Sequence, residues 1–171
     1  MNHNFYSYKN CSPWDCHKYQ PGEWPASYLY MHSCHTADPK LAECGTVLAF
    51  MSIEELARWS DTTIGRRGDE YMEFKAQKAT VLLHALESDF PGITSCIENY
   101  YTSTPLTYRD YTGTVDGSIY GVVQDITAGP AGRVPHKTKI PNLLLSGQNI
   151  NSHGIMGVLV GTIVTCSELL S

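Results

Sequence analysis

The sequence predicts an α/β fold with α+β character, and three observations support this prediction. Two runs rich in aliphatic and aromatic residues, Ser27 to Ser33 and Thr46 to Met51, are typical of strands. The segment from Gly68 to Phe90 has a helical spacing of apolar residues and ends before Pro91. Near the carboxyl end, an apolar run at residues 142–146 precedes a small-residue turn and a helix that begins at Gly154, which predicts a strand, a turn and a helix in succession.

Length and charge place the chain among ordinary globular proteins. Its 171 residues can bury roughly 70% of the unfolded surface. The net charge of −5 gives no reason to expect nucleic acid or an anionic membrane as partner. Arg66 and Arg67 are the only adjacent arginines, and two basic residues make a weak patch.

The first residues have neither a basic region nor an apolar core of signal-peptide length. The longest apolar run, Ile155 to Cys166, is shorter than the roughly 20 residues that span a bilayer, so a buried helix is favoured over a transmembrane one. A cytoplasmic protein is therefore expected, and association with a membrane through an apolar substrate stays open.

The six cysteines contain no CxxC pair. Cys11 and Cys16 lie close to His17, and Cys34 is next to His35, so a zinc site is conceivable although its usual paired spacing is missing. Free thiols in a reducing compartment are favoured, and neither a bound metal nor a disulfide framework is expected.

The elements of the first half follow from local signals. Residues 1–27 are rich in aromatic and turn-forming residues and resemble the rim of a larger structure. Asp38 and Pro39 mark a turn between the two strands. The run Ser52 to Glu55 is a capping-box pattern that opens a short helix reaching about Trp59.

The long helix should start near Gly68 and Asp69, where acidic residues suit the helix dipole, and end at Phe90. One stripe of this helix is expected to pack in the core, with the lysine lying at its edge: Phe74, Lys78, Leu82, Ala85 and Leu86. Residues 93–101 fit either a helical turn or a strand, and the polar, glycine-rich residues 102–121 predict an irregular loop of fixed geometry.

The last helix is apolar nearly all round and is expected to be buried on most faces. Glycine costs roughly 1 kcal/mol in a helix relative to alanine, so Gly154, Gly157 and Gly161 need a reason. Close approach to a bound ring and tight packing against the preceding strand are equally good reasons. The amides and the positive end of this helix suit an electron-rich or anionic ligand.

Several segments resemble the carboxyl-terminal portion of phytoene dehydrogenase-related flavoproteins, in the retinol saturase and carotenoid isomerase-like branch. The most specific is Ile140 to Gly157, which reads IPNLLLSGQNINSHGIMG. Others are residues 4–6, 24–25, 58–59, 62–67, 104–113 and 117–121.

The resemblance implies part of a two-domain fold that binds FAD, with residues 1–138 from the substrate domain and residues 139–171 forming the terminal strand, turn and helix of the FAD domain. It implies that the start of the last helix faces the flavin. The cofactor-binding residues it implies are Gly147, Gln148, Asn149, His153, Gly154, Ile155, Met156 and Gly157. His153 either donates a proton near the flavin or, as is favoured, makes local hydrogen bonds at the helix start.

The resemblance also implies an oxidoreductase or isomerase that acts on a polyene or isoprenoid-like alkene of the carotenoid or retinoid class. Tyr108, Arg109 and Tyr111 would line the tunnel of this apolar substrate, or they would only anchor their own loop. No catalytic residue is assigned, because a flavin carries the transfer of electrons or hydride.

One element of the family is missing, because the chain contains no Gly-x-Gly-x-x-Gly turn for the ADP part of FAD. The chain is therefore expected to be a fragment, a split gene product or a decayed homologue. Binding of FAD by this chain alone should be weak or absent, and the chain alone should be inactive. Its partner would be the missing amino-terminal half, and the alternative is a non-enzymatic remnant that binds an apolar ligand or another chain.

Overall fold

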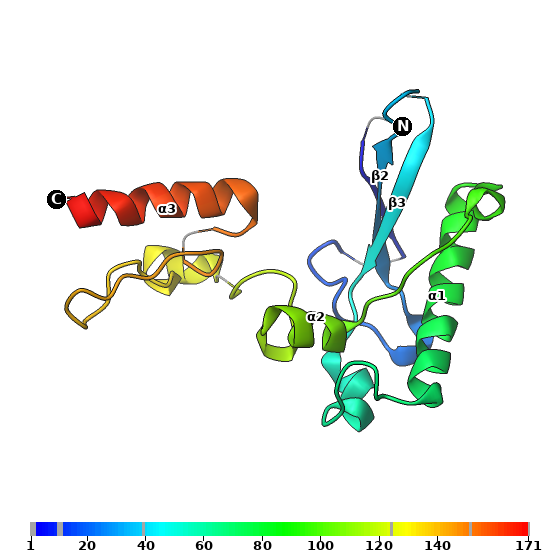
Figure 1. Cartoon of the computed structure of the whole chain (residues 1–171), viewed down its shortest axis with the longest axis horizontal. Coiled ribbons are helices and arrows are strands. Elements are labelled where there is room, and N and C mark those ends of the chain that lie inside the picture. Colours follow the sequence, from blue (N-terminus) through cyan, green and yellow to red (C-terminus); the bar gives the residue numbers. More distant parts are fainter. Residues whose placement is uncertain (1–2, 10–11, 39, 124, 151, 171) are drawn as a thin grey trace. The chain divides into compact units, whose positions relative to one another are not determined.

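The computed structural model describes residues 3–9, 12–38, 40–123, 125–150 and 152–170 (Figure 1). These residues belong to two compact units, Met1–Gly117 and Ser118–Ser171. The predicted α+β character is confirmed, since the first unit joins an antiparallel sheet to helices. The two-domain flavoprotein fold, and the division into substrate and cofactor portions at residues 138 and 139, stay predictions.

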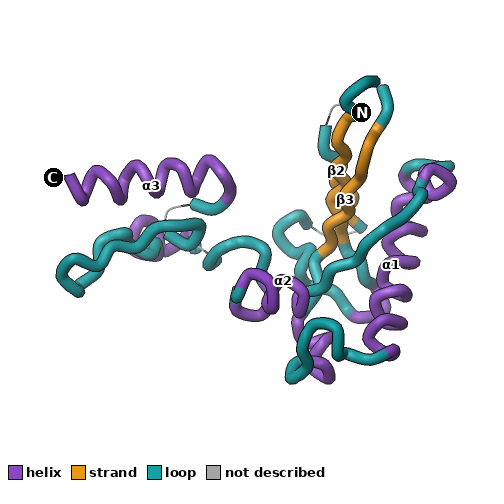
Figure 2. The backbone as a smooth tube through the Cα atoms, in the orientation of Figure 1, coloured by secondary structure: helices purple, strands orange, loops and turns teal. Residues whose placement is uncertain are grey.

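The strands lie in the first part of the chain, and helices follow them (Figure 2). In chain order, with 3₁₀ helices labelled η, they are β1 (Phe5–Tyr8), η1 (Pro21–Glu23), β2 (Ser27–Cys34), β3 (Ala42–Ala49), η2 (Ile53–Trp59), α1 (Asp69–Asp89), η3 (Ile93–Cys96), α2 (Pro105–Thr112), η4 (Val115–Gly117), η5 (Ile126–Gly132) and α3 (Gly154–Leu170).

The sheet of the first unit has the order β1-β2-β3, and both pairings are antiparallel. The two predicted strands are confirmed as β2 and β3, although β3 begins four residues earlier than expected, at Ala42. β1 is a strand that the sequence did not predict. Its aromatic residues pair with β2, with Phe5 opposite Tyr30, so part of the expected rim is an edge of the sheet itself.

Helix α1 packs against one face of this sheet (Figure 1). The Phe5 and Phe90 rings meet edge to face with centroids 4.7 Å apart, and the Tyr28 hydroxyl donates to the Asp89 carboxylate at 2.5 Å. Burial raises the pKa of Tyr28, and the hydrogen bond to Asp89 raises it further. The predicted helix is therefore confirmed. Its predicted stripe is confirmed in part, because Leu86 is buried whereas Phe74, Lys78, Leu82 and Ala85 are half-buried.

Lys78 of α1 is more enclosed than the predicted edge position. Its side chain is 17% exposed, pairs with Glu55 at 2.5 Å and lies 4.3 Å from the centre of the Trp24 ring. Tyr19 also donates to Glu55, so this lysine joins α1 to η2 and to the chain before the sheet.

The core of the first unit lies between η2, α1 and α2. It consists of Leu56, Trp59, Tyr71 and Leu106, and both leucines are fully buried. The Ser52 side chain caps η2 by accepting from the Glu54 N–H at 3.2 Å, as the capping pattern predicted in part. Because α2 contributes Leu106, this helix is fixed by the core.

Of the two alternatives left open for residues 93–101, the structure has the helical turn, η3. Two other sequence predictions about backbone structure are wrong. The expected irregular loop at residues 102–121 contains α2. The expected strand at residues 142–146 does not form: within the described residues, this segment makes one isolated bridge, between Lys137 and Leu144.

The second unit places α3 against this segment. The Thr165 hydroxyl donates to the Leu145 carbonyl at 3.2 Å, and Glu168 pairs with His136 at 3.5 Å and Lys137 at 3.3 Å. The helix is confirmed over Gly154–Leu170. The expectation that it is buried on most faces is wrong, because one face packs and the opposite face is exposed.

Candidate functional site

The first predicted site lies on α2, whose start is held by several independent contacts. Pro105 stands at the first helical position, and the Thr104 N–H donates to the Thr107 hydroxyl at 3.2 Å. The buried Tyr71 and Thr104 hydroxyls are 2.7 Å apart and hydrogen-bonded. Together with the burial of Leu106, these contacts fix which side of α2 faces outward.

A cluster of three charges joins this helix to the segment before α1. The buried Arg67 guanidinium donates through Nη2 to Oδ2 of Asp110, and Arg109 donates through Nε to Oδ1 at 3.1 Å. The side chains of Arg67 and Asp110 are 5% and 17% exposed. Burial alone would raise the pKa of Asp110, but the hydrogen bonds from Arg67 and Arg109 outweigh it and lower that pKa below its usual value.

Arg67 and Asp110 were not among the predicted site residues, and Arg67 is a buried anchor instead of half of a basic patch. The signal that could have identified them is the spacing of Leu106 and Asp110, four residues apart on one helical face. That signal becomes readable only once residues 105–112 are known to be helical.

Of the predicted substrate residues, Tyr108 and Tyr111 lie on the outward half of α2, and Arg109 lies on its flank. Since Leu106 and Asp110 face the core, a helical spacing of 100° per residue puts Tyr108 at the middle of the outward face, between Arg109 and Tyr111. Tyr111 is 73% exposed, whereas Tyr108 and Arg109 are half-buried. The structure therefore presents all three from one short helix.

The second predicted site is the turn before α3. Gly147 and Gly154 have φ values of 119° and 79°, and nothing lies within 4 Å of a Cβ added at either position. Asn149 accepts a hydrogen bond from the Val122 N–H at 2.9 Å, and the His153 ring lies 5.2 Å from the Tyr120 ring. Gln148 is half-buried, and a Cβ added at Gly121 would lie 2.6 Å from its carbonyl oxygen.

Helix α3 begins with two accessible apolar side chains, Ile155 and Met156, which are 85% and 73% exposed. Gly157 is different, because a Cβ there would lie 2.5 Å from the Ser152 carbonyl oxygen. The open choice between a bound ring and tight packing is thus explained at Gly157 by packing of the chain against itself.

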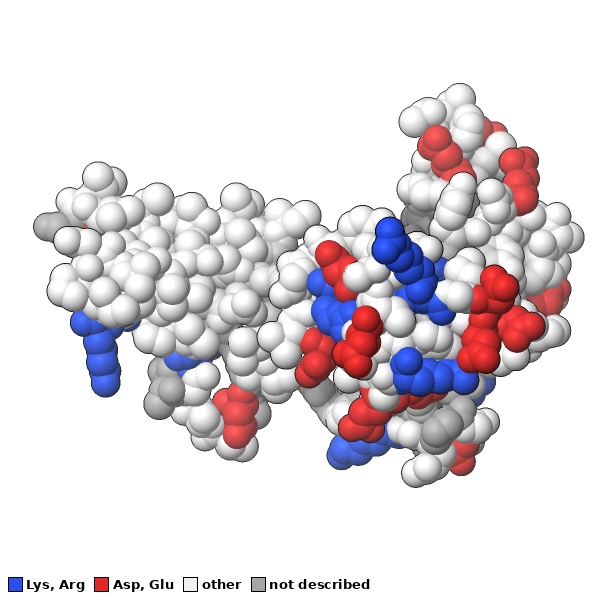
Figure 3. All heavy atoms as spheres, turned by 60° about the horizontal axis from the view of Figure 1, so that its bottom comes forward, with Lys and Arg blue, Asp and Glu red and all other residues white. Residues whose placement is uncertain are grey.

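The outward face of α3 is uncharged. Its two hydroxyls donate to carbonyls of their own helix, Thr162 to Val158 at 2.9 Å and Ser167 to Ile163 at 3.0 Å. Glu168 points to the packed side, toward Lys137. In the face shown in Figure 3, acidic and basic side chains are crowded over the first unit, and the surface of the second unit carries few of them.

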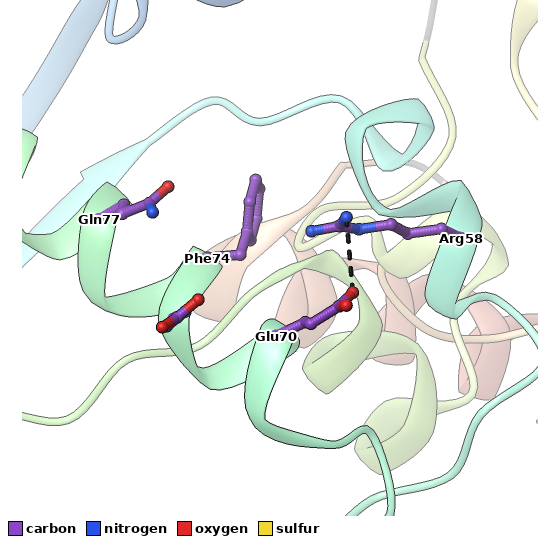
Figure 4. Close-up of a pocket in the computed structure, with 5 residues that line it drawn as sticks. Arg58, Glu70, Phe74 and Gln77 are labelled. Carbon is purple, nitrogen blue, oxygen red and sulfur yellow. Dashed lines mark ion pairs between the residues drawn. The ribbon is translucent and has the colours of Figure 1, made fainter.

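Two open hollows lie in the first unit, and neither contains a predicted site residue. One, of about 240 Å³, lies between η2 and α1, with Arg58 and Glu70 paired across it at 3.7 Å (Figure 4). Its other lining residues are Glu73, Phe74 and Gln77. The second, of about 420 Å³, lies between the sheet and α1 and is lined by Ser7, Lys9, Tyr28, Val81, His84, Ala85, Ser88 and Asp89. Charged, open linings of this kind do not suit an apolar polyene.

The described residues were also compared with the requirements of a metal site and of a membrane-spanning helix. In that part of the chain, no group of three or more His, Cys, Asp or Glu side chains is placed to hold a metal ion. Cys16, Cys34, Cys44, Cys96 and Cys166 are free thiols, and Cys11 lies outside the described residues. Among the helices described here, none has the length and apolar content needed to cross a bilayer.

Comparison with known proteins gives one group of relatives. The chain is 30% identical to the all-trans-retinol 13,14-reductase of Danio rerio over 128 residues, which cover 73% of the chain and 21% of that protein. It is 30% identical to the Rattus norvegicus protein of the same name over 132 residues, covering 73% of the chain and 21% of the relative, and 28% identical to the Homo sapiens protein over 120 residues, covering 68% and 20%. No protein-family model and no solved structure matches.

These relatives confirm the resemblance to the retinol saturase-like branch. The chain spans about a fifth of the length of the curated relatives it matches.

Proposed function

We propose, taking kinship with the all-trans-retinol 13,14-reductases as the premise, that this chain forms part of an FAD-dependent oxidoreductase or isomerase. Its substrate would be a polyene or isoprenoid-like alkene of the retinoid or carotenoid class. The observation that carries this proposal is the 30% identity to the Danio rerio reductase over 128 residues. The chain corresponds to about a fifth of such a protein, so we propose that it needs the remaining part for activity.

The turn and the start of α3 have features that fit a flavin. The first N–H groups of a helix have no acceptor within the helix, and the helix dipole makes that end positive. The space beside Gly147 and Gly154 is open, and Ile155 and Met156 offer apolar surface next to it. A reduced flavin ring, which is flat and gains negative charge, suits this combination.

Some residues of this turn would contact the FAD, and others would hold the backbone of the turn in place. Gly154, Ile155 and Met156 would contact the ring, and Gly147 and Gln148 would face the ribityl and pyrophosphate side. Asn149 and Gly157 would hold the turn in shape, because their contacts are to Val122 and Ser152. Bound FAD would supply the transfer of electrons or hydride, so these residues bind and orient it.

A chimera tests this proposal. The segment of the Danio rerio reductase that matches this chain would be replaced by the chain, and the purified protein would be assayed for bound FAD by its absorbance and for reduction of all-trans-retinol. We expect a yellow, active chimera. An Ile155→Asp chimera should retain less FAD, and an Ile163→Asp chimera, altered on the same helix two turns away, serves as its matched control. A folded chimera without FAD would contradict the proposal.

A second function is favoured by one observation, the exposed apolar face of α3. An uncharged helix face of this size is typical of a docking surface for another chain, and a non-enzymatic remnant that binds a partner would use it. In that case Ile163→Asp would abolish partner binding and Ile155→Asp would not alter FAD content. The two chimeras therefore separate the two functions.

A further inference from the structure

We propose that Arg109 binds the oxygen-bearing end of the polyene and that Asp110 and Arg67 are positioning residues for its guanidinium. This inference rests on the proposed function, and it adds a substrate preference: polyenes that end in a carboxylate or another acceptor oxygen over hydrocarbons of the same length.

The geometry of the charge cluster supports this role. Asp110 receives Arg67 on one carboxylate oxygen and Arg109 on the other, so its two oxygens are divided between two guanidinium groups. Arg109 uses Nε for this contact. Within the described residues it forms an ion pair only with Asp110, and its side chain is 31% exposed, so its Nη groups are available to an added acceptor.

The cluster has more donors than acceptors. Two arginines face one carboxylate, so one positive charge is left over. An added acceptor oxygen beside Arg109 would balance this excess, and guanidinium groups bind carboxylates with charge-assisted hydrogen bonds.

The neighbouring side chains suit the rest of such a ligand. Tyr108 and Tyr111 lie on the outward half of α2, and Arg109 lies on the flank of the helix beside Tyr108. Aromatic rings bind flat conjugated chains by stacking and by burial of apolar area. A polyene lying along the two tyrosines would bring its end group to the guanidinium.

Arg67 acts only through Asp110. It is buried, its guanidinium lies 5.2 Å from the centre of the Tyr71 ring, and it cannot reach a ligand on the outward face. Its effect on binding is to hold the Asp110 carboxylate, and through it the orientation of Arg109.

The test is a titration of the full 171-residue chain with three probes of equal length: retinoic acid, retinol, and the hydrocarbon in which a methyl group replaces the CH₂OH of retinol. Quenching of tryptophan fluorescence reports binding. We expect affinity to fall in that order. Arg109→Gln should weaken retinoic acid binding by about 10-fold or more while hydrocarbon binding stays unchanged. Arg109→Lys, which keeps the charge, should recover part of the loss.

Asp110→Asn should lower the ratio of retinoic acid affinity to hydrocarbon affinity. A loss of folded protein alone would reduce both affinities equally, so this ratio separates positioning from stability. Arg66→Gln, which removes an exposed guanidinium from the loop before α1, is the matched control and should leave the ratio unchanged.

The outcomes separate this inference from the proposed function. If all three probes bind equally and Arg109→Gln changes nothing, the end-group role is wrong and polyene binding stands. If no probe binds, neither the end-group role nor a polyene site on this chain survives.

Discussion

Replacing Asp110 with alanine would leave the Arg67 guanidinium buried without its carboxylate. The side chain of Arg67 is 5% exposed and that of Asp110 is 17% exposed, so water screens this pair poorly. Removing one partner of a buried pair typically costs about 3–5 kcal/mol. We expect the low end, about 3 kcal/mol, because Asp110 lies at the edge of the core and keeps some contact with water.

The assay is urea unfolding followed by tryptophan fluorescence. Trp14, Trp24 and Trp59 all belong to the first unit, so the signal reports this unit alone. The double variant Arg67→Met with Asp110→Leu should recover most of the loss, because an apolar pair leaves no charge unpaired.

Glu70→Ala is the matched control. It breaks the Arg58–Glu70 pair, whose side chains are 60% and 79% exposed, and should cost less than about 1 kcal/mol. If Asp110→Ala costs no more than this control, the Arg67–Asp110 pair does not anchor α2 and the reasoning is refuted.

Three further predictions concern the pH dependence of stability, the packing of α3 and the binding of FAD. The pKa of Asp110 is lowered in the folded protein, so its contribution to stability is complete above the unfolded pKa of about 3.9 and is lost as the pH falls through the folded pKa. The difference in unfolding free energy between wild type and Asp110→Asn should therefore shrink below about pH 4. A difference that is constant with pH would contradict this. Gly157→Leu should destabilise the second unit by about 1–3 kcal/mol through the clash with Ser152, seen as faster hydrogen exchange of α3 amides, and unchanged exchange would show that no close contact exists. The chain alone with added FAD should show no thermal shift, whereas binding at 100 times Kd would add about 2.7 kcal/mol of stability and contradict weak or absent binding.

Much of the first unit was predictable because the ends of its helices and strands are marked by residues close to them in the sequence. Gly68 before α1, the acidic residues in its first turn and Pro91 after it mark a helix whose ends differ from the prediction by one residue at most. β2 and β3 follow from their aliphatic and aromatic runs. In contrast, β1 has only four residues among turn formers, and its pairing with β2 depends on a contact distant in sequence.

Helix α2 was missed because its composition resembles a loop. Its threonines and tyrosines are weak helix formers, the following Gly113 favours a turn, and only Thr104 with Pro105 marks the start of a helix. What overrides the weak helix propensity is tertiary: burial of Leu106 and the bond from Arg67 to Asp110. The three predicted substrate residues lie on this helix and their role stays a prediction, and the charge cluster beside them could not be identified without the helix.

The glycines of α3 differ in whether packing alone accounts for them. Gly157 lies against the Ser152 carbonyl, and Gly161 is buried on the packed face one turn before Thr165, which bonds the Leu145 carbonyl. These small residues therefore let the helix approach its own unit closely. Gly154 differs, because its φ of 79° is needed at the helix start and the space beside it is open. If a flavin ring approaches this helix, it does so at Gly154 and its two exposed apolar neighbours, and a substitution at Gly157 would report packing before it reported cofactor binding.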